Sequence, residues 1–435
     1  MSGQELNDET YATCRADMML KSPDRKVNIY PGNSFTEDGL AGERFDYLLA
    51  NPPFGVEWKK VADQVRDEHD TLGFNGRFGA GLPRINDGSL LFLQHMISKM
   101  KAPADGGTRL AIVFNGSPLF TGAAGSGESE IRRWIIEHDW LEAVVALPDQ
   151  LFYNTGISTY FWVVTNRKTP DRRGKVQLLD ARELFVKMRK SLGEKRKQIS
   201  DGQIDEVVSL YAAFTESDRV KIFPNESFGF QRITVERPLR LRWSIDESTL
   251  AVLASVKPVA RLESPARDAF LAAVGALAPL DTTSRNSARS AVRPLLAAAG
   301  LKGAPAEKAI LDALSVRDPS APEVTGRGGE VEPDPDQRDQ ENVPFPEGTP
   351  VFEEDVSERL AAPAFRDAVE QYVKAEVLPW VPDAWVDHSR TKVGYEIPLT
   401  RHFYKYVPPR PLEEIDAEIK ALEAEIQALL REVVE

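Results

Sequence analysis

The sequence predicts an α/β fold, with a doubly wound and mostly parallel sheet in the first half and a largely α-helical C-terminal region. Three observations indicate this fold. Short apolar runs, typical of buried strands, alternate with helical patterns in the first half. Ala- and Leu-rich stretches with helical character dominate much of the second half. The chain ends in an apolar heptad repeat, which predicts a coiled-coil helix.

The first half begins with a predicted helix over residues 5–20. Apolar or β-rich runs predict six strands, at 27–30, 45–50, 109–115, 142–147, 158–166 and 175–181. Helical patterns at 89–100 and 128–138 lie between strands, and this alternation is typical of a parallel sheet with a helix layer on both faces. The fourth and fifth strands are joined by a segment too short for a helix, so we expect an antiparallel strand at one edge.

The second half is predicted to hold a basic helix after the strand at 175–181, and Ala/Leu-rich helices over 250–315. Residues 317–350 are rich in Pro, Gly and acidic residues, which favours a disordered linker or loop. Helical character resumes at 353–378. The terminal heptad seam consists of Leu412, Ile415, Ile419, Leu422, Ile426, Leu429 and Val433.

Composition excludes several classes of protein. The chain of 435 residues has no apolar run long enough to span a membrane, and its polar, acidic N-terminus is unlike a signal peptide. Cys14 is the single cysteine, which excludes an internal disulfide or a thiolate metal cluster, and the five histidines show no metal-ligand spacing. We therefore expect a cytoplasmic protein without a membrane segment or a metal.

Charge is distributed unevenly. The net charge of −13 argues against a simple basic nucleic-acid coat. Residues 167–197, however, contain twelve Lys or Arg and four acidic residues. Such a segment could follow DNA phosphates, or it could be an ordinary solvated face.

The motif that carries chemistry directly follows the apolar strand ending at Ala50, and consists of Asn51, Pro52, Pro53 and Phe54. In open α/β sheets, ligands bind beyond the carboxyl ends of the strands. The Asn carboxamide oxygen and a prolyl carbonyl could both accept hydrogen bonds from one exocyclic NH2 group, while the phenyl ring stacks on the base. These are the requirements for methylating N6 of a flipped adenine. The alternative is an ordinary Asn-Pro turn that ends a strand.

Several longer segments make the resemblance specific. The chain resembles the modification (M) subunit of type I restriction-modification systems, a DNA adenine-N6 methyltransferase that depends on S-adenosylmethionine. The resemblance covers about residues 1–245 and 350–435. It rests on GQELNDETYATCRADMML, PGNSF, FDYLLANPPFG, ALPDQLFYNTGISTYFWVVTNRK, KVQLLDAR and TKVGYEIPLTRHFYKYVPPRPLEEIDAEIKAL.

The resemblance implies an incomplete Rossmann-like methyltransferase sheet and three residues that bind the cofactor, namely Glu5, Asn33 and Asn51. Glu5 would accept hydrogen bonds from the ribose hydroxyls of S-adenosylmethionine, and Asn33 would face its adenine. The alternatives are an acidic residue favoured by a helix N-terminus for Glu5 and a Gly-Asn turn for Asn33. Asn51 would lie at the junction of the cofactor and target-base sites, and Pro52, Pro53 and Phe54 would complete the base site.

The resemblance also divides the chain into four parts and implies partners. The expected parts are a partial methyltransferase domain (1–190), a basic helix with a connecting segment (191–249), a helical insertion with its acidic linker (250–350) and a helical docking region (351–435). The implied partners are double-stranded DNA, a specificity subunit and a restriction subunit.

One departure from the family puts activity in doubt. The family has a glycine-rich cofactor loop shortly before the Gly-Gln-Glu segment, whereas here Met1 lies four residues before Glu5. We therefore expect an N-terminally truncated chain that lacks this loop. Two alternatives stay open: an inactive remnant that keeps partner and DNA binding, and a methyltransferase that acts on RNA or protein.

Overall fold

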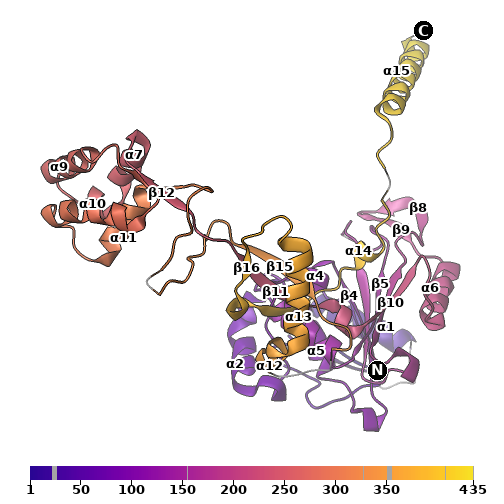
Figure 1. Cartoon of the computed structure of the whole chain (residues 1–435). Coiled ribbons are helices and arrows are strands. Elements are labelled where there is room, and N and C mark those ends of the chain that lie inside the picture. Colours follow the sequence, from indigo (N-terminus) through magenta and orange to yellow (C-terminus); the bar gives the residue numbers. More distant parts are fainter. Residues whose placement is uncertain (22–26, 154, 327, 350–354, 407, 435) are drawn as a thin grey trace. The chain divides into compact units, whose positions relative to one another are not determined.

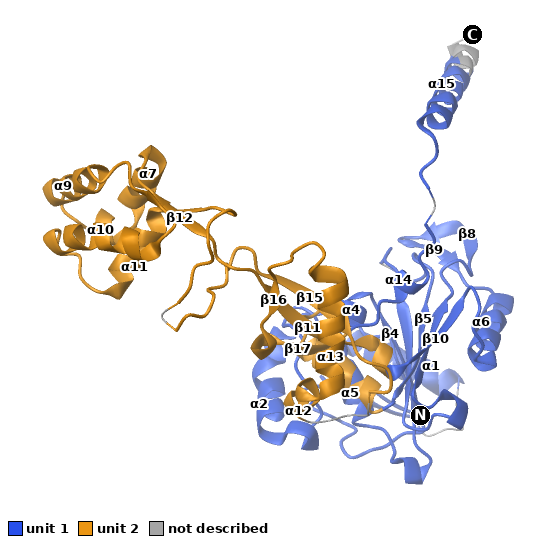
Figure 2. Ribbon diagram, viewed as in Figure 1, with its two compact units in different colours: residues 1–121, 139–225, 396–435 blue, residues 122–138, 226–395 orange. Residues whose placement is uncertain are grey.

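The structure is a computed structural model that describes residues 1–21, 27–153, 155–326, 328–349, 355–406 and 408–434. The chain forms two units, which Figure 2 shows in different colours. Unit 1 comprises residues 1–121, 139–225 and 396–435, and unit 2 comprises residues 122–138 and 226–395. Unit 2 therefore includes a helix whose sequence lies between two strands of unit 1.

A six-stranded mixed sheet dominates unit 1 (Figure 1). Its spatial order is β10-β7-β5-β6-β4-β3. Strand β3 is parallel to β4, and β5 is parallel to β7, whereas β6 and β10 run antiparallel to their neighbours. The bounds are β3 Tyr47–Ala50, β4 Arg109–Phe114, β5 Leu141–Ala146, β6 Tyr160–Thr165, β7 Lys175–Asp180 and β10 Val220–Pro224. The predicted strands from 45–50 to 175–181 are thus confirmed.

The expected position of the antiparallel strand was wrong. Strand β6 is antiparallel to β5, as its short connection required, but it lies inside the sheet between β4 and β5. All but one of its residues are buried, which explains the apolar run YFWVVT. The antiparallel edge strand is instead β10, which pairs with β7 and was not predicted.

The N-terminal residues form a separate two-stranded parallel sheet in unit 1. Strands β1 (Ser2–Glu5) and β2 (Asn28–Pro31) pair from Ser2 with Asn28 to Glu5 with Pro31. Helix α1 (Asp8–Lys21) connects them and confirms the helix predicted over 5–20. The helix begins later than predicted, at Asp8, because Glu5 is the last residue of β1.

Helices and a hairpin complete unit 1. The other helices are α2 Ala62–Leu72, α3 Ser89–Ile97, α4 Ser117–Phe120, α6 Asp201–Ala213, α14 Leu399–His402 and α15 Leu412–Val434. Helix α6 packs on the sheet beside β7, where Val207 and Leu210 contact the cluster around Val145 and Leu179. Within the described part of the chain, no helix is long and apolar enough to cross a membrane.

The predicted basic helix is instead an antiparallel hairpin. Strands β8 (Val186–Leu192) and β9 (Lys195–Gln198) pair, and Gly193 has a φ of +62° in the two-residue turn between them. A glycine in this conformation is typical of such tight hairpins. The helix prediction followed the charge of the segment and overlooked the even spacing of the apolar residues Val186, Met188 and Leu192 along β8.

Unit 2 contains a second sheet, which corrects the expectation of a largely α-helical C-terminal region. Central strand β11 (Gly229–Glu236) pairs antiparallel with β15 (Asp339–Pro344), β16 (Trp385–Val386) and β17 (Lys392–Tyr395). Strand β15 lies within the predicted linker at 317–350. Only Val343 of this strand is buried, so its sequence is as polar as that of a loop.

Helices in unit 2 pack on this sheet and hold charged groups inside the unit. They are α5 Gly127–Glu137, α12 Val356–Ala361, α13 Pro363–Tyr372 and a π-helical turn Val373–Val377. The last three confirm the helical character predicted at 353–378. Residues 353–354 of that prediction lie outside the described residues. Glu137 of α5 accepts hydrogen bonds from Arg359 and from the Tyr395 hydroxyl, the latter at 2.6 Å. These contacts assign α5 to the C-terminal unit.

The Ala/Leu-rich segment forms a small helical subdomain of unit 2, as predicted for 250–315. Strand β12 (Leu241–Ser244) pairs with β13 (Asp281–Thr282) and β14 (Ser315–Arg317). Around them lie α7 Glu247–Ser255, α8 Lys257–Ala260, α9 Ser264–Gly275, α10 Arg285–Ala298 and α11 Ala304–Ala313. Its core surrounds Trp243, whose indole N–H donates to the Leu311 carbonyl at 3.1 Å.

Candidate functional site

The predicted catalytic motif lies at the carboxyl end of β3. Ala50 is the last residue of the strand, and the Asn51 side chain is exposed and makes no hydrogen bond among the described residues. Pro52 is buried, Phe54 is half-buried and Pro53 is exposed. A buried proline without an N–H group can hold the loop while leaving the carboxamide free to contact a ligand.

Hydrogen bonds connect the residues just after the motif to the next loops at the same edge of the sheet. The Gly88 amide donates to the Val56 carbonyl at 2.8 Å, and the Trp58 indole donates to the Arg84 carbonyl at 2.9 Å. Asp87 in turn accepts a hydrogen bond of 2.8 Å from the Ser117 hydroxyl, just beyond β4. Because β3 and β4 are parallel neighbours, the loops after both strands meet at one edge.

Two of the predicted cofactor residues, Glu5 and Asn33, lie together at the carboxyl ends of β1 and β2. The Gly32 amide donates to the Glu5 carbonyl at 2.9 Å, which places Asn33 next to Glu5. Glu5 Oε1 accepts from the Asn7 amide at 2.9 Å, and Oε2 makes no hydrogen bond in the described part of the chain. Asn33 Oδ1 accepts from the Phe35 amide at 2.9 Å, as in an Asx turn. Asn51 follows a different strand, β3, which does not pair with β1 among the described residues.

Sequence reasoning missed the residues that fix the loop carrying Asn33. Arg77 donates to the carbonyls of Ser34 at 2.6 Å and Phe35 at 2.8 Å. Lys99 donates to the Leu40 carbonyl at 2.8 Å and pairs with Asp38. No motif marked Arg77 or Lys99, because their partners are backbone carbonyls about 40 to 60 positions away.

The Arg77 guanidinium belongs to a partly buried charge network. It forms a two-pronged ion pair with Glu68 and donates to Nδ1 of His95 at 3.2 Å. Burial and the neighbouring Arg77 charge lower the pKa of His95 to about 4, although Asp38 and Glu68 partly oppose this shift. Burial raises the pKa of Glu68, but the hydrogen bonds from Arg77 outweigh it and hold that pKa below its usual value. His95 is therefore neutral at pH 7 and accepts from Arg77.

This arrangement predicts a loss of local stability in weak acid. The folded-state pKa of His95, about 4, lies below its unfolded value of 6.5, so its stabilising contribution is complete above pH 6.5 and is lost as the pH falls towards 4. We expect the free energy of opening of α3, measured by amide hydrogen exchange, to fall by about 2 kcal/mol between pH 7 and pH 5. His95→Asn retains an acceptor without titrating and should remove this decrease. An equal decrease in the variant would contradict the assignment.

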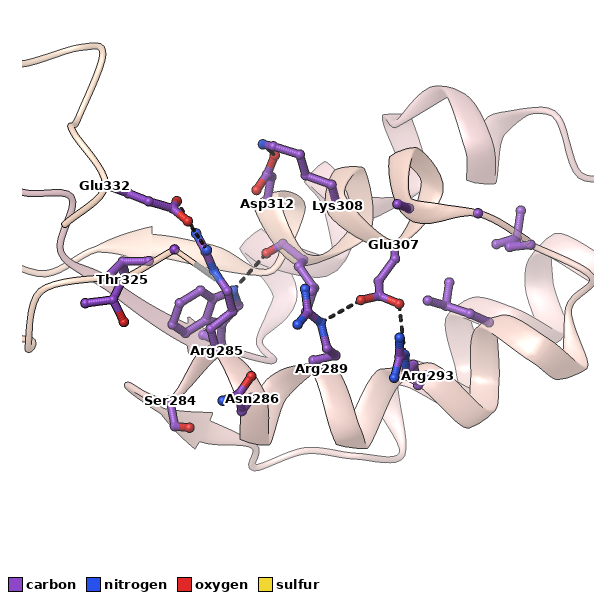
Figure 3. A pocket seen from close by; sticks show the side chains of 18 of the residues that line it. Ser284, Arg285, Asn286, Arg289, Arg293, Glu307, Lys308, Asp312, Thr325 and Glu332 are labelled. Carbon is purple, nitrogen blue, oxygen red and sulfur yellow. Dashed lines mark hydrogen bonds and ion pairs between the residues drawn. The ribbon is translucent and has the colours of Figure 1, made fainter. Parts of the chain in front are cut away.

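A large cavity lies elsewhere, in the helical subdomain of unit 2. It has a volume of about 1020 Å³, and Figure 3 shows arginines of α10 pointing towards acidic residues across it. Arg289 and Arg293 both pair with Glu307, at 2.6 and 3.0 Å, and Arg285 pairs with Glu332 at 2.7 Å. These ion pairs neutralise the arginines. None of the predicted site residues lines this cavity.

The fold and the loop at β3 agree with a family assignment. The sequence profile of the N-6 DNA methylase family matches residues 1–227, more than half of the chain. The chain belongs to the N-6 DNA methylase family. The resemblance to type I modification subunits is thereby confirmed at the level of the family, and the matched region includes Glu5, Asn33 and the motif beginning at Asn51.

Relatives of this N-6 DNA methylase come from type I restriction enzymes. The chain is 31% identical to the HindI methylase subunit of Haemophilus influenzae over 183 residues, or 42% of this chain and 38% of that protein. It is 25% identical to the MjaIX methylase subunit of Methanocaldococcus jannaschii over 217 residues, or 50% and 36%. The matched region thus spans less than two fifths of either relative.

A solved structure with a similar description also matches. It is the type I restriction-modification methyltransferase subunit from Streptococcus thermophilus, with 25% identity and a TM-score of 0.44. The match covers 52% of this chain and 45% of that one.

Proposed function

We propose that this chain is the site-specific DNA adenine-N6 methyltransferase subunit of a type I restriction-modification system. The observation that carries the proposal is Asn51, whose side chain is exposed at the carboxyl end of β3 and has no hydrogen-bond partner among the residues that the structure describes. The buried Pro52 behind it holds the loop. The family match and the type I relatives support this substrate and this kind of assembly.

The motif would orient the target amine of an adenine flipped out of the DNA. Asn51 Oδ1 and the Pro52 carbonyl would each accept a hydrogen bond from the N6 amino group, which directs the nitrogen lone pair towards the methyl donor. Asn51 and Pro52 would thus hold the amine in the orientation that accepting the cofactor's methyl group requires. Phe54 would stack on the flipped base.

The residues at the ends of β1 and β2 fit the adenosine part of S-adenosylmethionine. When bound, this cofactor supplies an electrophilic methyl group. Glu5 Oε2 makes no hydrogen bond among the described residues and could accept from a ribose hydroxyl, and Asn33 retains its Nδ2 donors for the adenine. Gly32, which lies between the end of β2 and Asn33, has a φ of +113° that allows a tight turn there.

We predict that the 435-residue chain alone binds S-adenosylmethionine weakly or not at all. In the proposal Glu5 and Asn33 contact only the ribose and the adenine, and among the described residues β1 and β3 belong to separate sheets, so no strand pairing joins these two residues to the loop of Asn51. Isothermal titration calorimetry with the purified chain should show little heat. Tight binding with one site per chain would contradict the prediction and would show that another segment holds the methionine end.

The proposed partners are double-stranded DNA, a specificity subunit and a restriction subunit. The basic hairpin β8–β9 exposes Lys187, Arg189, Lys190 and Arg196, which could contact DNA phosphates without reading sequence. Sequence recognition would then belong to the specificity subunit. Helix α15, with its exposed apolar seam, is the proposed docking element for that subunit.

Methyl-acceptor assays with DNA, RNA and protein substrates test the proposal, using the chain assembled with its specificity subunit. Transfer to adenine N6 of DNA would support it. Transfer to RNA or protein alone would mean that the chain is a methyltransferase with a different methyl acceptor. Absence of transfer with DNA binding retained would favour the alternative of a catalytically inactive chain that keeps partner and DNA binding.

A further inference from the structure

The cavity of the helical subdomain lies outside residues 1–227, which the family profile matches. Its volume of about 1020 Å³ is at the upper end of the range for small-molecule sites. Residues of α10, of α11 and of the loop around Val324 line it. The family match therefore assigns no ligand to this cavity.

Three arginines line the cavity from one side of α10. Arg285, Arg289 and Arg293 are four residues apart, so they project from one face of the helix at intervals of about 6 Å. Figure 3 shows their side chains pointing from α10 towards acidic residues across the cavity. Lys302 and Lys308 add two more cations to the lining. Such a row of cationic side chains favours an anionic ligand.

The acidic residues balance only part of this charge. Glu307 pairs with both Arg289 and Arg293, so a single carboxylate offsets two guanidinium groups. Lys302 forms no ion pair with any residue that the structure describes, and its side chain is exposed at the cavity. Positive charge is therefore in excess around Glu307.

The geometry of the two ion pairs leaves hydrogen-bond donors available. Glu307 Oε1 lies 2.6 Å from Nε of Arg289, and Oε2 accepts from Nε of Arg293 at 3.0 Å. The terminal amino groups of both arginines make no hydrogen bond within the described part of the chain. Two adjacent guanidinium groups held in this way can donate to the oxygens of a phosphoryl group.

The first turn of α11 adds further donors beside these arginines. Gly303 is the N-cap residue of this helix and has no side chain to cap the turn. Both Gly303 and Ala304 line the cavity next to Lys302. Backbone amides at a helix N-terminus favour phosphate, so they complement the arginine side chains.

We infer that this cavity binds a small anion with two or more phosphoryl groups, such as a nucleoside triphosphate or an inorganic polyphosphate. Arg289 and Arg293 donate to one phosphoryl group, and Lys302 with the start of α11 contacts the next. Asp312 and Glu323 are exposed in the same lining and would repel a long polyanion such as duplex DNA. The site lies within unit 2 and does not rest on the proposed function.

Isothermal titration calorimetry of the purified chain with sodium tripolyphosphate tests the inference. We expect one site per chain, weaker in high salt, and little heat from sodium sulfate at the same ionic strength. Arg289→Gln with Arg293→Gln should weaken binding about 100-fold, because two charged donors are lost. Lys257→Gln with Arg261→Gln, the matched control, removes two positive charges from the same subdomain outside the cavity and should change nothing.

A second variant has an effect of the opposite sign, which loss of folding cannot imitate. Glu307→Gln removes the negative charge beside the anion and keeps the shape of the side chain, so tripolyphosphate should bind about tenfold more tightly. Amide hydrogen exchange measured in parallel should show slower exchange at residues 304–308 when tripolyphosphate is bound, and unchanged exchange in α9.

ATP and a short DNA duplex distinguish the sources of the phosphoryl groups. Equal affinities for ATP and tripolyphosphate would support recognition of the phosphoryl groups alone, and a higher affinity for ATP would support a nucleoside phosphate. The inference is overturned if neither compound binds more tightly than sulfate, if the double arginine variant binds normally, if Glu307→Gln fails to tighten binding, or if duplex DNA displaces tripolyphosphate. None of these readouts involves methyl transfer, so the inference and the proposed function can fail separately.

Discussion

Replacing Asn51 with alanine is expected to abolish methyl transfer by the assembled enzyme while cofactor binding largely survives. In the proposed mechanism the carboxamide oxygen acts on the target amine, so we expect its loss to affect the chemical step. Loss of one positioned hydrogen-bonding group at a reacting centre typically costs about 10²–10³-fold in kcat. The measurement is single-turnover transfer of labelled methyl groups to DNA, with S-adenosylmethionine binding measured in parallel by calorimetry.

Two further variants make this result specific. Asn51→Asp keeps an acceptor oxygen in the same place and should retain more activity than the alanine variant. Asn286→Ala changes an exposed asparagine of the helical subdomain and should leave turnover unchanged. Near-normal turnover of the Asn51→Ala enzyme would remove Asn51 from the mechanism and with it the support for the proposed function.

The double substitution Ile419→Asp and Ile426→Asp is expected to abolish co-purification with the specificity subunit. Both residues lie in the middle of the α15 seam, one heptad apart, and are 50% and 55% exposed. A single helix of this length with an exposed apolar stripe is only marginally stable in water without a partner. Acidic residues flank the seam, so a protein partner with basic or apolar helices fits it better than DNA.

A matched double variant controls for the charge that this change adds. Ala424→Asp with Gln427→Asp adds the same two negative charges to this helix outside the seam and should leave the complex intact. Circular dichroism should show that unit 1 stays folded in both variants. Survival of the complex in the Ile419/Ile426 variant would mean that docking lies elsewhere. The seam itself is described from Leu412 to Leu429, and the Val433 side chain lies outside the described residues.

Local patterns predicted the elements whose sequence signal is strong. The run RLAIVF became buried strand β4, and the helix predicted at 128–138 became α5. The basic hairpin was missed because charge outweighed the period-two alternation from Val186 onwards. Strand β15 was missed because an edge strand with a single buried residue, Val343, has the composition of a loop.

Pairings between distant residues could not be predicted in the same way. Sequence placed Asn33 in a turn, but only the fold brings Arg77 and Lys99 to the carbonyls that fix this turn. Similarly, α5 lies between two sheet strands in sequence, yet Glu137 binds Arg359 and Tyr395 more than 200 positions away. Such contacts depend on chain topology, which no local pattern encodes.

The sequence by itself determined the α/β class of the first half, the strand that ends at Ala50 and the chemical character of the loop that follows it. These features depend on short-range periodicity and on the hydrogen-bonding groups of a few consecutive residues. Only the tertiary structure decided that β6 lies inside the sheet, that β1 and β3 belong to separate sheets among the described residues, and that Tyr47 and Leu49 border an open groove. The physical reason is that strand order and burial are set by long-range pairing, so an apolar strand such as YLLA has the same sequence whether or not its face is covered.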